Sequence, residues 1–267
     1  MITTLAAWHY PHRTMEENII YFSEKGFKGI SLLGSHTADM LREGRGEAVA
    51  ALIKKYDLTL TVHGKMPSTH NREAVTAFEE EIRLFGQWQK NFGVMDILSF
   101  DVAGQIRDNI VPYGQFVMDT VPGITIAVED VGLNENEYRQ MEVLGRSGRF
   151  ASLVDIGHMF LRLTAQKGDE VWTAQKWHQC FVEALRAMPL SIAEIHLHNN
   201  DGRRDMHWFL EEGELDIPMI SRVLDEIGYD AVLTIESAPG FQFPCYGDEA
   251  DTKILRTWEY WKNIRGE

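Results

Sequence analysis

The 267-residue chain contains little cysteine and no long apolar segment. Only Cys180 and Cys245 occur, they form no Cys-x-x-Cys pair, and no secretory apolar segment follows Met1. This pattern favours a reducing, cytoplasmic compartment. Because no apolar run approaches the length needed to cross a bilayer, we expect no membrane-spanning segment.

Positive charge is also scarce. The 26 basic residues are outnumbered by 40 acidic ones, and the formal net charge is -14. Such an excess of acid disfavours long-range attraction to nucleic acid or to an anionic membrane, and it favours a small-molecule partner. The sequence has no glycine-rich phosphate loop, repeat, low-complexity tract or linker, so a single domain over residues 1–267 is expected. Its oligomeric state is left open.

Eight short apolar segments are predicted to be strands. They cover residues 3–7, 29–33, 58–63, 95–100, 124–129, 152–155, 192–198 and 232–236. Segments with the apolar spacing of helices lie between them, at residues 15–25, 74–92, 170–188, 217–227 and 251–262. The pattern is weakest over 33–58 and 129–151, where glycines interrupt it. Eight strand and helix units in alternation predict an α/β fold, specifically a (β/α)8 TIM barrel.

Four consecutive predicted strands, the fifth to the eighth, end in acidic or imidazole side chains: Glu129, Asp155, His198 and Glu236. Active sites of such barrels lie at the carboxyl ends of the strands, so the four side chains are expected to converge. A buried carboxylate is costly unless it is paired or coordinated, and three of them together indicate a divalent cation. The alternative is that the carboxylates lie in surface loops and follow the strands by chance.

A second group of candidate ligands lies close to the first in the sequence. His158 follows Asp155 by three residues, and Asp205 and His207 follow His198 in a loop. His158, Asp205 and His207 are therefore a possible second metal cluster. Histidine-rich ligation favours zinc, whereas the carboxylate-rich set also suits manganese, magnesium or cobalt. Asp205 and His207 are alternatively part of a solvated loop.

Other side chains are candidates for the surroundings of the cation. His63 closes the third strand and is either a ligand, a substrate donor or a hydrogen-bonded core residue. His196 points to the same side of its strand as His198 but deeper, and is interpreted as a residue behind the ligands. Trp8 and His9 follow the first strand and are candidate substrate contacts, with core packing as the alternative for Trp8. Loops at residues 35–44 and 238–247 are expected to set substrate identity.

The order and spacing of four segments resemble the xylose isomerase-like barrels, a superfamily of sugar isomerases and epimerases, inosose dehydratases and endonuclease IV. The segments are Ile126-Ala-Val-Glu129, Val154-Asp-Ile-Gly-His158, Val232-Leu-Thr-Ile-Glu236, and His198-Asn-Asn-Asp201 followed by Asp205-Met-His207. The resemblance extends over essentially the whole chain. It implies a (β/α)8 barrel in which Glu129, Asp155, His198 and Glu236 are the shared metal ligands.

The resemblance to endonuclease IV has one departure. His158, Asp205 and His207 match the additional zinc ligands of those nucleases, which also carry a histidine at the end of the fourth strand. This chain reads Ile97-Leu-Ser-Phe-Asp101 there, so Ser99 or Asp101 would have to replace it. This departure argues against a complete three-zinc site. Endonuclease IV-like phosphodiester hydrolysis is still the second hypothesis, because His63, His158, Asp205 and His207 are present.

The resemblance to ketose epimerases implies that Glu129 and Glu236 exchange protons with carbon atoms of the sugar, and that Arg204 binds the substrate. His158 is a further candidate substrate contact. Arg204 is alternatively a solvated loop charge. Removing a proton next to a carbonyl creates an enediolate, whose charge a divalent cation stabilises. We therefore predict a divalent-metal-dependent isomerase or epimerase acting on a sugar, sugar acid or cyclitol. Related lyase chemistry, endonuclease IV-like phosphodiester hydrolysis and a catalytically inactive sugar-binding barrel are the alternatives.

Overall fold

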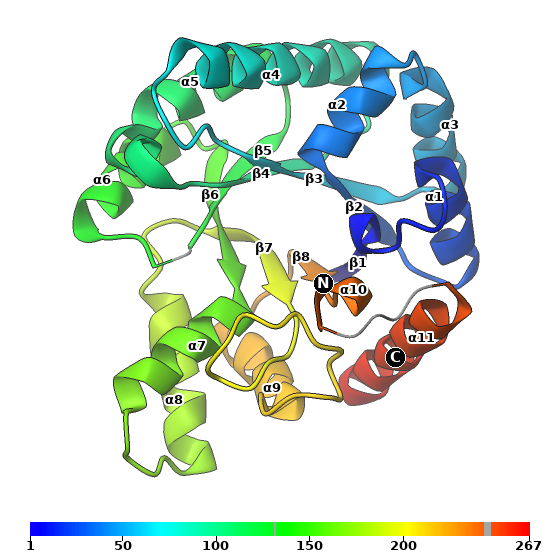
Figure 1. Cartoon of the computed structure of the whole chain (residues 1–267). Helices are drawn as coiled ribbons and strands as arrows, with labels where there is room; N and C mark the ends of the chain where they lie inside the picture. The colour runs from blue at the N-terminus through cyan, green and yellow to red at the C-terminus, as the bar shows by residue number, and fades with distance from the viewer. Residues whose placement is uncertain (131, 243–246) are drawn as a thin grey trace.

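The computed structural model of the chain describes residues 1–130, 132–242 and 247–267. In this part of the chain, parallel strands close into a barrel in the order β1 to β8, and β8 pairs with β1 (Figure 1). The strands are β1 Ile2–Ala6, β2 Gly29–Leu33, β3 Thr59–Lys65, β4 Ile97–Asp101, β5 Thr125–Glu129, β6 Phe150–Asp155, β7 Ile192–Leu197 and β8 Val232–Ile235. The predicted (β/α)8 TIM barrel is confirmed.

Helices surround the barrel (Figure 1). The α-helices are α1 Met15–Glu24, α2 Gly34–Arg42, α3 Gly46–Tyr56, α4 Arg72–Phe92, α5 Ile110–Thr120, α6 Glu135–Gly145, α7 Ile156–Lys167, α8 Ala174–Arg186, α9 Ile217–Ile227, α10 Pro239–Gln242 and α11 Asp248–Arg265. Short 3-10 helices are η1 Ala7–His9 and η2 Gly104–Asn109. Among the described residues, no helix combines the length and the apolar character needed to cross a membrane.

Two sequence expectations about these connections need correction. Most of the segment 35–44, expected to be a loop, belongs to α2, and Gly44 adopts a left-handed φ of 76° between α2 and α3. The glycines that weakened the helical pattern over 33–58 therefore mark the turn between two helices, not the absence of a helix. The predicted helix 170–188 begins only at Ala174, because the Thr173 side chain accepts a hydrogen bond from the Lys176 amide and caps it. Residues 243–246 of the segment 238–247 lie outside the described residues, as does Cys245.

The barrel interior is polar. Buried interior side chains are Thr4, Ser31, Thr61, Glu194 and Thr234. They hydrogen-bond across adjacent strands: Thr4 and Thr234 hydroxyl oxygens lie 2.6 Å apart, and Thr61 donates to Ser31 at 2.7 Å. Alternate strand residues, mostly leucine, isoleucine and valine, point outward and pack against the helices. Along each strand, polar side chains therefore face the barrel interior and apolar side chains face the helices.

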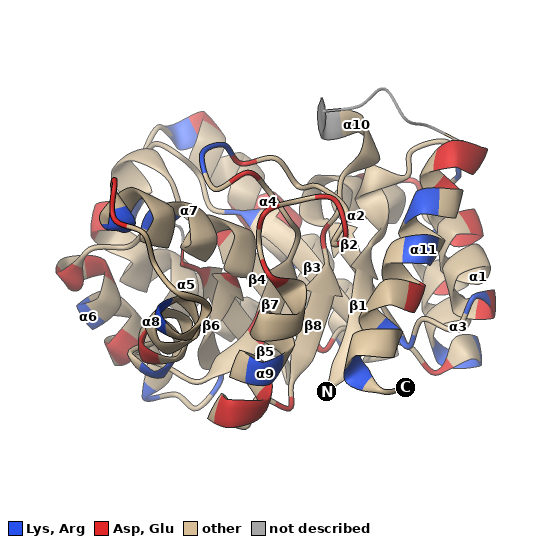
Figure 2. Cartoon of the chain, turned by 90° about the horizontal axis from the view of Figure 1, so that it is seen from below, with Lys and Arg blue, Asp and Glu red and all other residues tan. Residues whose placement is uncertain are grey.

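Charged residues lie mainly on the outer helices and the loops. In the view of Figure 2, lysine and arginine are interspersed among aspartate and glutamate over α1, α8, α9 and α11. The acidic excess of the composition is thus spread over many elements in this view.

Candidate metal centre

The four predicted ligands lie at the carboxyl ends of β5 to β8. Glu129 and Asp155 are the last residues of β5 and β6, and Glu236 and His198 directly follow β8 and β7. Their exposed fractions are 2%, 0%, 7% and 0%, respectively. Three acidic groups are therefore buried together at one end of the barrel.

Asp155 lies at the centre of this arrangement. Its Oδ1 atom is 3.2 Å from Nε2 of His198. Its carboxylate also belongs to two groups in which all candidate donor atoms are within 4.8 Å of one another, one with His196 and Glu236 and one with Glu129 and His158. The Oδ2 atom is buried and has no hydrogen-bond partner. Since an unpartnered buried carboxylate oxygen is costly, a bound cation would relieve a real energetic penalty, and the donor set fits one.

His196 was predicted to lie behind the ligands, but its ring contacts one of the carboxylates. Its Nδ1 is 3.0 Å from Oε2 of Glu236. The ring also joins a second group with His63 and Glu129, and neither of its nitrogens forms a hydrogen bond. His198, the predicted ligand, also lies against an acid, because its Nε2 is 3.2 Å from Oδ1 of Asp155 and has no hydrogen-bond partner. The two histidines of this strand therefore contact different carboxylates, His196 beside Glu236 and His198 beside Asp155.

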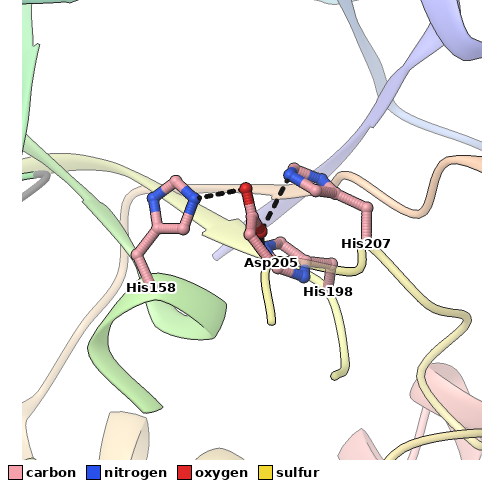
Figure 3. Close-up of side chains that lie close together, drawn as sticks. All are labelled: His158, His198, Asp205 and His207. Carbon is pink, nitrogen blue, oxygen red and sulfur yellow. Dashed lines mark ion pairs between the residues drawn. The ribbon is translucent and has the colours of Figure 1, made fainter. Parts of the chain in front are cut away.

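His198 belongs to a second group at the outer side of the centre, together with His158, Asp205 and His207 (Figure 3). The two Asp205 oxygens bridge the histidines: Oδ2 lies 3.1 Å from Nε2 of His158, and Oδ1 lies 3.3 Å from Nε2 of His207. The His198 and His207 rings stack with centroids 3.8 Å apart. His207 adopts a left-handed φ of 46°, a strained conformation that the surrounding contacts must hold. The structure thus brings the predicted second cluster together and adds His198 to it.

Asp155 and His158 stabilise each other's charged forms. Burial alone would raise the pKa of Asp155, but neighbouring histidines, His158 first among them, hold it well below its usual range. The negative charge of Asp155 in turn raises the pKa of His158 to about 12, against the effect of burial. A divalent cation at this site would displace protons from such histidines, so cation binding is linked to pH.

The two predicted acid/base glutamates differ in proton affinity. Burial raises the pKa of Glu129 to about 7, although the hydrogen bond from His158 opposes this. Burial would also raise the pKa of Glu236, but the charges of His196 and His207 lower it to about 2. At neutral pH, Glu236 is ionised and Glu129 is poised between its two forms.

Trp8 and His63 lie beside the carboxylates. Their rings stack with centroids 6.0 Å apart and an interplanar angle of 16°. His63 Nδ1 lies 3.1 Å from the Ser99 hydroxyl, and its Nε2 lies 3.5 Å from Oδ1 of Asp101. Both residues considered as replacements for the strand-four histidine therefore contact His63.

Of the predicted substrate contacts His9 and Arg204, one lies at the centre and the other lies outside it. His9 groups with His207 and Glu236, and burial lowers the pKa of His9 to about 4, so its ring is neutral at pH 7. The Arg204 side chain is 69% exposed and pairs with Asp201 of its own loop at 2.9 Å. The structure therefore brings His9 to the centre and leaves Arg204 outside it.

Solved structures provide the comparison over the whole chain. A D-tagatose 3-epimerase-like protein is 19% identical with a TM-score of 0.68, covering 100% of this chain and 99% of that one. A D-psicose 3-epimerase is 14% identical with a TM-score of 0.66 and full coverage of both chains. The 3-keto-D-glucoside 4-epimerase of E. coli is 15% identical with a TM-score of 0.63, covering 98% of each. The whole chain therefore shares its (β/α)8 barrel fold with these proteins.

Sequence comparisons extend less far. No family model matches the chain. A stretch of 57 residues, 21% of the chain, is 39% identical to an uncharacterized protein of Methanocaldococcus jannaschii. The match spans about a fifth of that relative, 20% of its length.

One interior acidic residue of the barrel was not predicted from the sequence. Glu194 lies in β7, two residues before His196, and is fully buried. The signal was present, because an acid within an apolar strand on the same face as His196 must find a partner inside the barrel. Glu194 lies inside its strand, whereas the predicted acidic ligands lie at strand ends.

Proposed function

We propose that the chain is a divalent-metal-dependent isomerase or epimerase acting on a sugar, sugar acid or cyclitol. The observation that carries this proposal is that buried Glu129 and buried Glu236 each lie close enough to Asp155 to share a cation with it, and that Oδ2 of Asp155 has no hydrogen-bond partner. The similarity in fold to three proteins whose names denote sugar epimerases or relatives of one supports the substrate class.

Glu129, Asp155 and Glu236 would hold the cation together with one histidine of the β7 end. His198 is the predicted ligand, and its Nε2 lies 3.2 Å from Oδ1 of Asp155 without a hydrogen-bond partner. His196, whose Nδ1 lies 3.0 Å from Glu236, is the neighbouring histidine. Three carboxylates and one imidazole suit manganese, zinc, magnesium or cobalt. When bound, the cation would act as a Lewis acid that stabilises the negative charge of an enediolate.

Proton transfer falls to the two glutamates. Glu236 is ionised at neutral pH and is suited to remove the proton next to the substrate carbonyl. Glu129, whose pKa is raised to about 7, is suited to return a proton from another direction, because its strand β5 is separated from β8 by β6 and β7. Epimerisation requires removal from one face and delivery to the other, and two carboxylic groups with different proton affinity meet that requirement.

Polar and aromatic side chains around the carboxylates would orient the substrate. The Trp8 ring offers an apolar face for a sugar, and His9, His63 and His158 offer ring nitrogens to its hydroxyls. Arg204 would have to leave Asp201 to reach a substrate.

The decisive experiment measures deuterium incorporation from D2O into a panel of ketoses with manganese or cobalt present. We expect metal-dependent exchange at the carbon next to the carbonyl, abolished by EDTA. Glu236→Gln should reduce it by about 100-fold or more, because it removes the base. Glu142→Gln, at an exposed position on α6, is the matched control and should exchange like the parent. Exchange that persists undiminished in Glu236→Gln would remove Glu236 from the mechanism, and sugar binding without exchange would favour a non-catalytic barrel.

A second candidate function is phosphodiester hydrolysis of the endonuclease IV type. The group of His158, His198, Asp205 and His207 supports it, because four donors within 4.8 Å of one another suit an additional zinc ion. Incubation with zinc and DNA containing an abasic site distinguishes the two functions. Efficient strand cleavage, absent in Asp205→Asn, would overturn the isomerase proposal.

A further inference from the structure

Asp130 directly follows Glu129 at the carboxyl end of β5 and is 1% exposed, yet it has no part in the reaction proposed above. Its amide donates to the Leu153 carbonyl of β6 at 2.9 Å, so the strand pattern continues through it. Since successive strand residues point to opposite faces, Glu129 points toward the metal centre and Asp130 toward the surrounding helices. A buried carboxylate on that outer side is costly unless it is paired.

Arg162 of α7 binds Asp130 through both its side chain and its main chain. The Nη2 atom donates to Oδ2 of Asp130 at 2.7 Å, and Nη1 donates to the Asp130 carbonyl oxygen at 2.8 Å. The donors of a guanidinium group have a fixed planar arrangement, so two such bonds fix the direction of the groups that accept them. The Asp130 backbone is therefore held at its amide by β6 and at its carbonyl by α7.

The second carboxylate oxygen of Asp130 holds the connection between β5 and α6. Oδ1 accepts hydrogen bonds from the Tyr138 hydroxyl at 3.0 Å and from the amides of Gly132 and Leu133 at 3.2 and 3.3 Å. Both oxygens of this carboxylate thus have donors, unlike those of Asp155, whose Oδ2 has none. Asp130 is accordingly a structural acid beside the metal centre and not a candidate ligand.

The ion pair lies next to a contact within the metal centre. Arg162 follows His158 by four residues on α7, so the two side chains lie on one face of the helix, one turn apart. His158 Nδ1 lies 2.9 Å from Oε1 of Glu129. Two neighbouring residues at the end of β5 therefore contact two neighbouring positions on α7. Because a buried ion pair adds little stability compared with apolar packing, we look for its benefit in this fixed geometry.

We propose that Asp130 and Arg162 are positioning residues that hold the end of β5 against α7, so that the Glu129 carboxylate is directed at both His158 and the cation. This inference rests on the proposed function, in which Glu129 is a metal ligand and an acid/base group, and it deepens that function. Neither residue touches the substrate. Both act through the backbone of Glu129 and Asp130.

The test measures manganese affinity by calorimetry in the parent and in Arg162→Met, which keeps an apolar stem but donates no hydrogen bond. We expect the affinity to fall by about 10-fold or more, as is typical when a residue that orients a metal ligand is lost. Arg162→Lys should lose less, because an ammonium group can donate to one Asp130 oxygen but lacks the planar fork for both. Circular dichroism establishes that each variant is folded, and Arg162→Lys decides the outcome if Arg162→Met is not.

Arg107→Met is the matched control. Arg107 of η2 pairs with Glu137 at 2.9 Å and donates to the Gly132 carbonyl at 3.0 Å, so it supports the same connection between β5 and α6. Each arginine is partly exposed, and each acidic partner has a side chain that is 2% exposed. Arg107→Met should lower the urea midpoint as Arg162→Met does but bind manganese like the parent. An equal loss of affinity in both variants would overturn the specific role of Arg162.

A double-variant cycle separates the positioning of Glu129 from a general loss of structure. In Glu129→Gln the carboxylate that the ion pair positions is gone. Adding Arg162→Met to it should therefore lower manganese affinity by no more than about twofold. Additive losses of affinity, or parental affinity in the folded Arg162 variants, overturn the inference.

Crystal structures of cation-free protein supply a readout that needs neither metal nor sugar. We expect the contact between Glu129 Oε1 and His158 Nδ1, 2.9 Å in the parent, to persist in Arg107→Met and to be lost in Arg162→Met. Its persistence in Arg162→Met overturns the inference. A parent that binds manganese but exchanges no sugar overturns the proposed function alone. A parent that binds no cation overturns the metal centre, and the crystal structures then decide whether Arg162 positions Glu129.

Discussion

At the scale of single residues, the position of His198 depends on Gly157, the second residue of α7. A Cβ atom on Gly157 would lie 2.1 Å from Cε1 and 2.3 Å from Nε2 of His198, far closer than real contacts allow. The glycine is required for space, because its φ is not in the left-handed region. This close approach lets the first turn of α7 lie against the ring.

Gly157→Ala should therefore destabilise the protein by about 1–3 kcal/mol through overpacking. In a His198→Ala background the penalty should vanish, because the ring that the new methyl group meets is gone, and the two changes are expected to be strongly non-additive. Urea denaturation of the parent, both single variants and the double variant measures this coupling. Additive effects would show that Gly157 acts independently of His198.

At the scale of elements, the C-terminal helix α11 is attached to the β1–α1 connection by a buried ion pair. Both guanidinium Nη atoms of Arg13 donate to Asp251, one of them at 2.7 Å, and the Asp251 side chain is 7% exposed. The carboxylate raises the pKa of Arg13 further. A bidentate pair in this geometry joins the connection before α1 to the C-terminal helix.

Arg13→Ala should lower the free energy of unfolding by about 1–3 kcal/mol, because it leaves the Asp251 carboxylate without its main partner. Arg13→Lys should recover only part, since an ammonium group cannot donate in the same fork. Arg83→Ala is the comparison: it breaks an exposed pair with Glu79 in α4 and should cost no more than about 0.5 kcal/mol. Equal effects of Arg13→Ala and Arg83→Ala on thermal unfolding would contradict the structural role of the Arg13 pair.

Elements with clear local start and stop signals were predicted correctly from the sequence. Helix α9 matches its expected range of 217–227, because Asp216 caps it and Gly228 ends it with a left-handed φ. Helix α7 begins at Ile156, immediately after β6, with Asp155 as its capping residue. Asp155 thus both ends β6 and caps α7. Only the first of these roles was predicted from the sequence.

At the scale of the whole molecule, the barrel gathers histidines from β3, β7, α7 and the loop before α9 around the acids. The pKa of His207 is raised to about 9, with burial opposed chiefly by Glu236, and the pKa of His158 is raised to about 12 by Asp155. Groups with a raised pKa stabilise the folded state fully below their unfolded pKa near 6.5. That stabilisation is lost as pH rises through the folded pKa.

We therefore expect EDTA-treated protein to lose thermal stability as pH rises from about 6.5 to 9. A bound divalent cation should have the opposite pH dependence, because less proton competition strengthens its binding. The increase in Tm on adding manganese or zinc should grow over the same pH range, with a stabilisation of about 2.7 kcal/mol when free cation is 100 times Kd. Scanning calorimetry at several pH values measures both trends, and a cation effect that shrinks with rising pH would contradict them.

The sequence by itself determined the alternation of strands and helices, and with it the barrel and the strand ends that carry Glu129, Asp155 and Glu236. Apolar periodicity is local, so a linear pattern suffices to predict it. Only the tertiary structure decided that His196 lies beside Glu236, that His198 contacts both Asp155 and His207, and that Glu194 lies 3.5 Å from His196. These relations depend on the register and closure of eight strands, because side chains far apart in the chain become neighbours only when β8 pairs with β1.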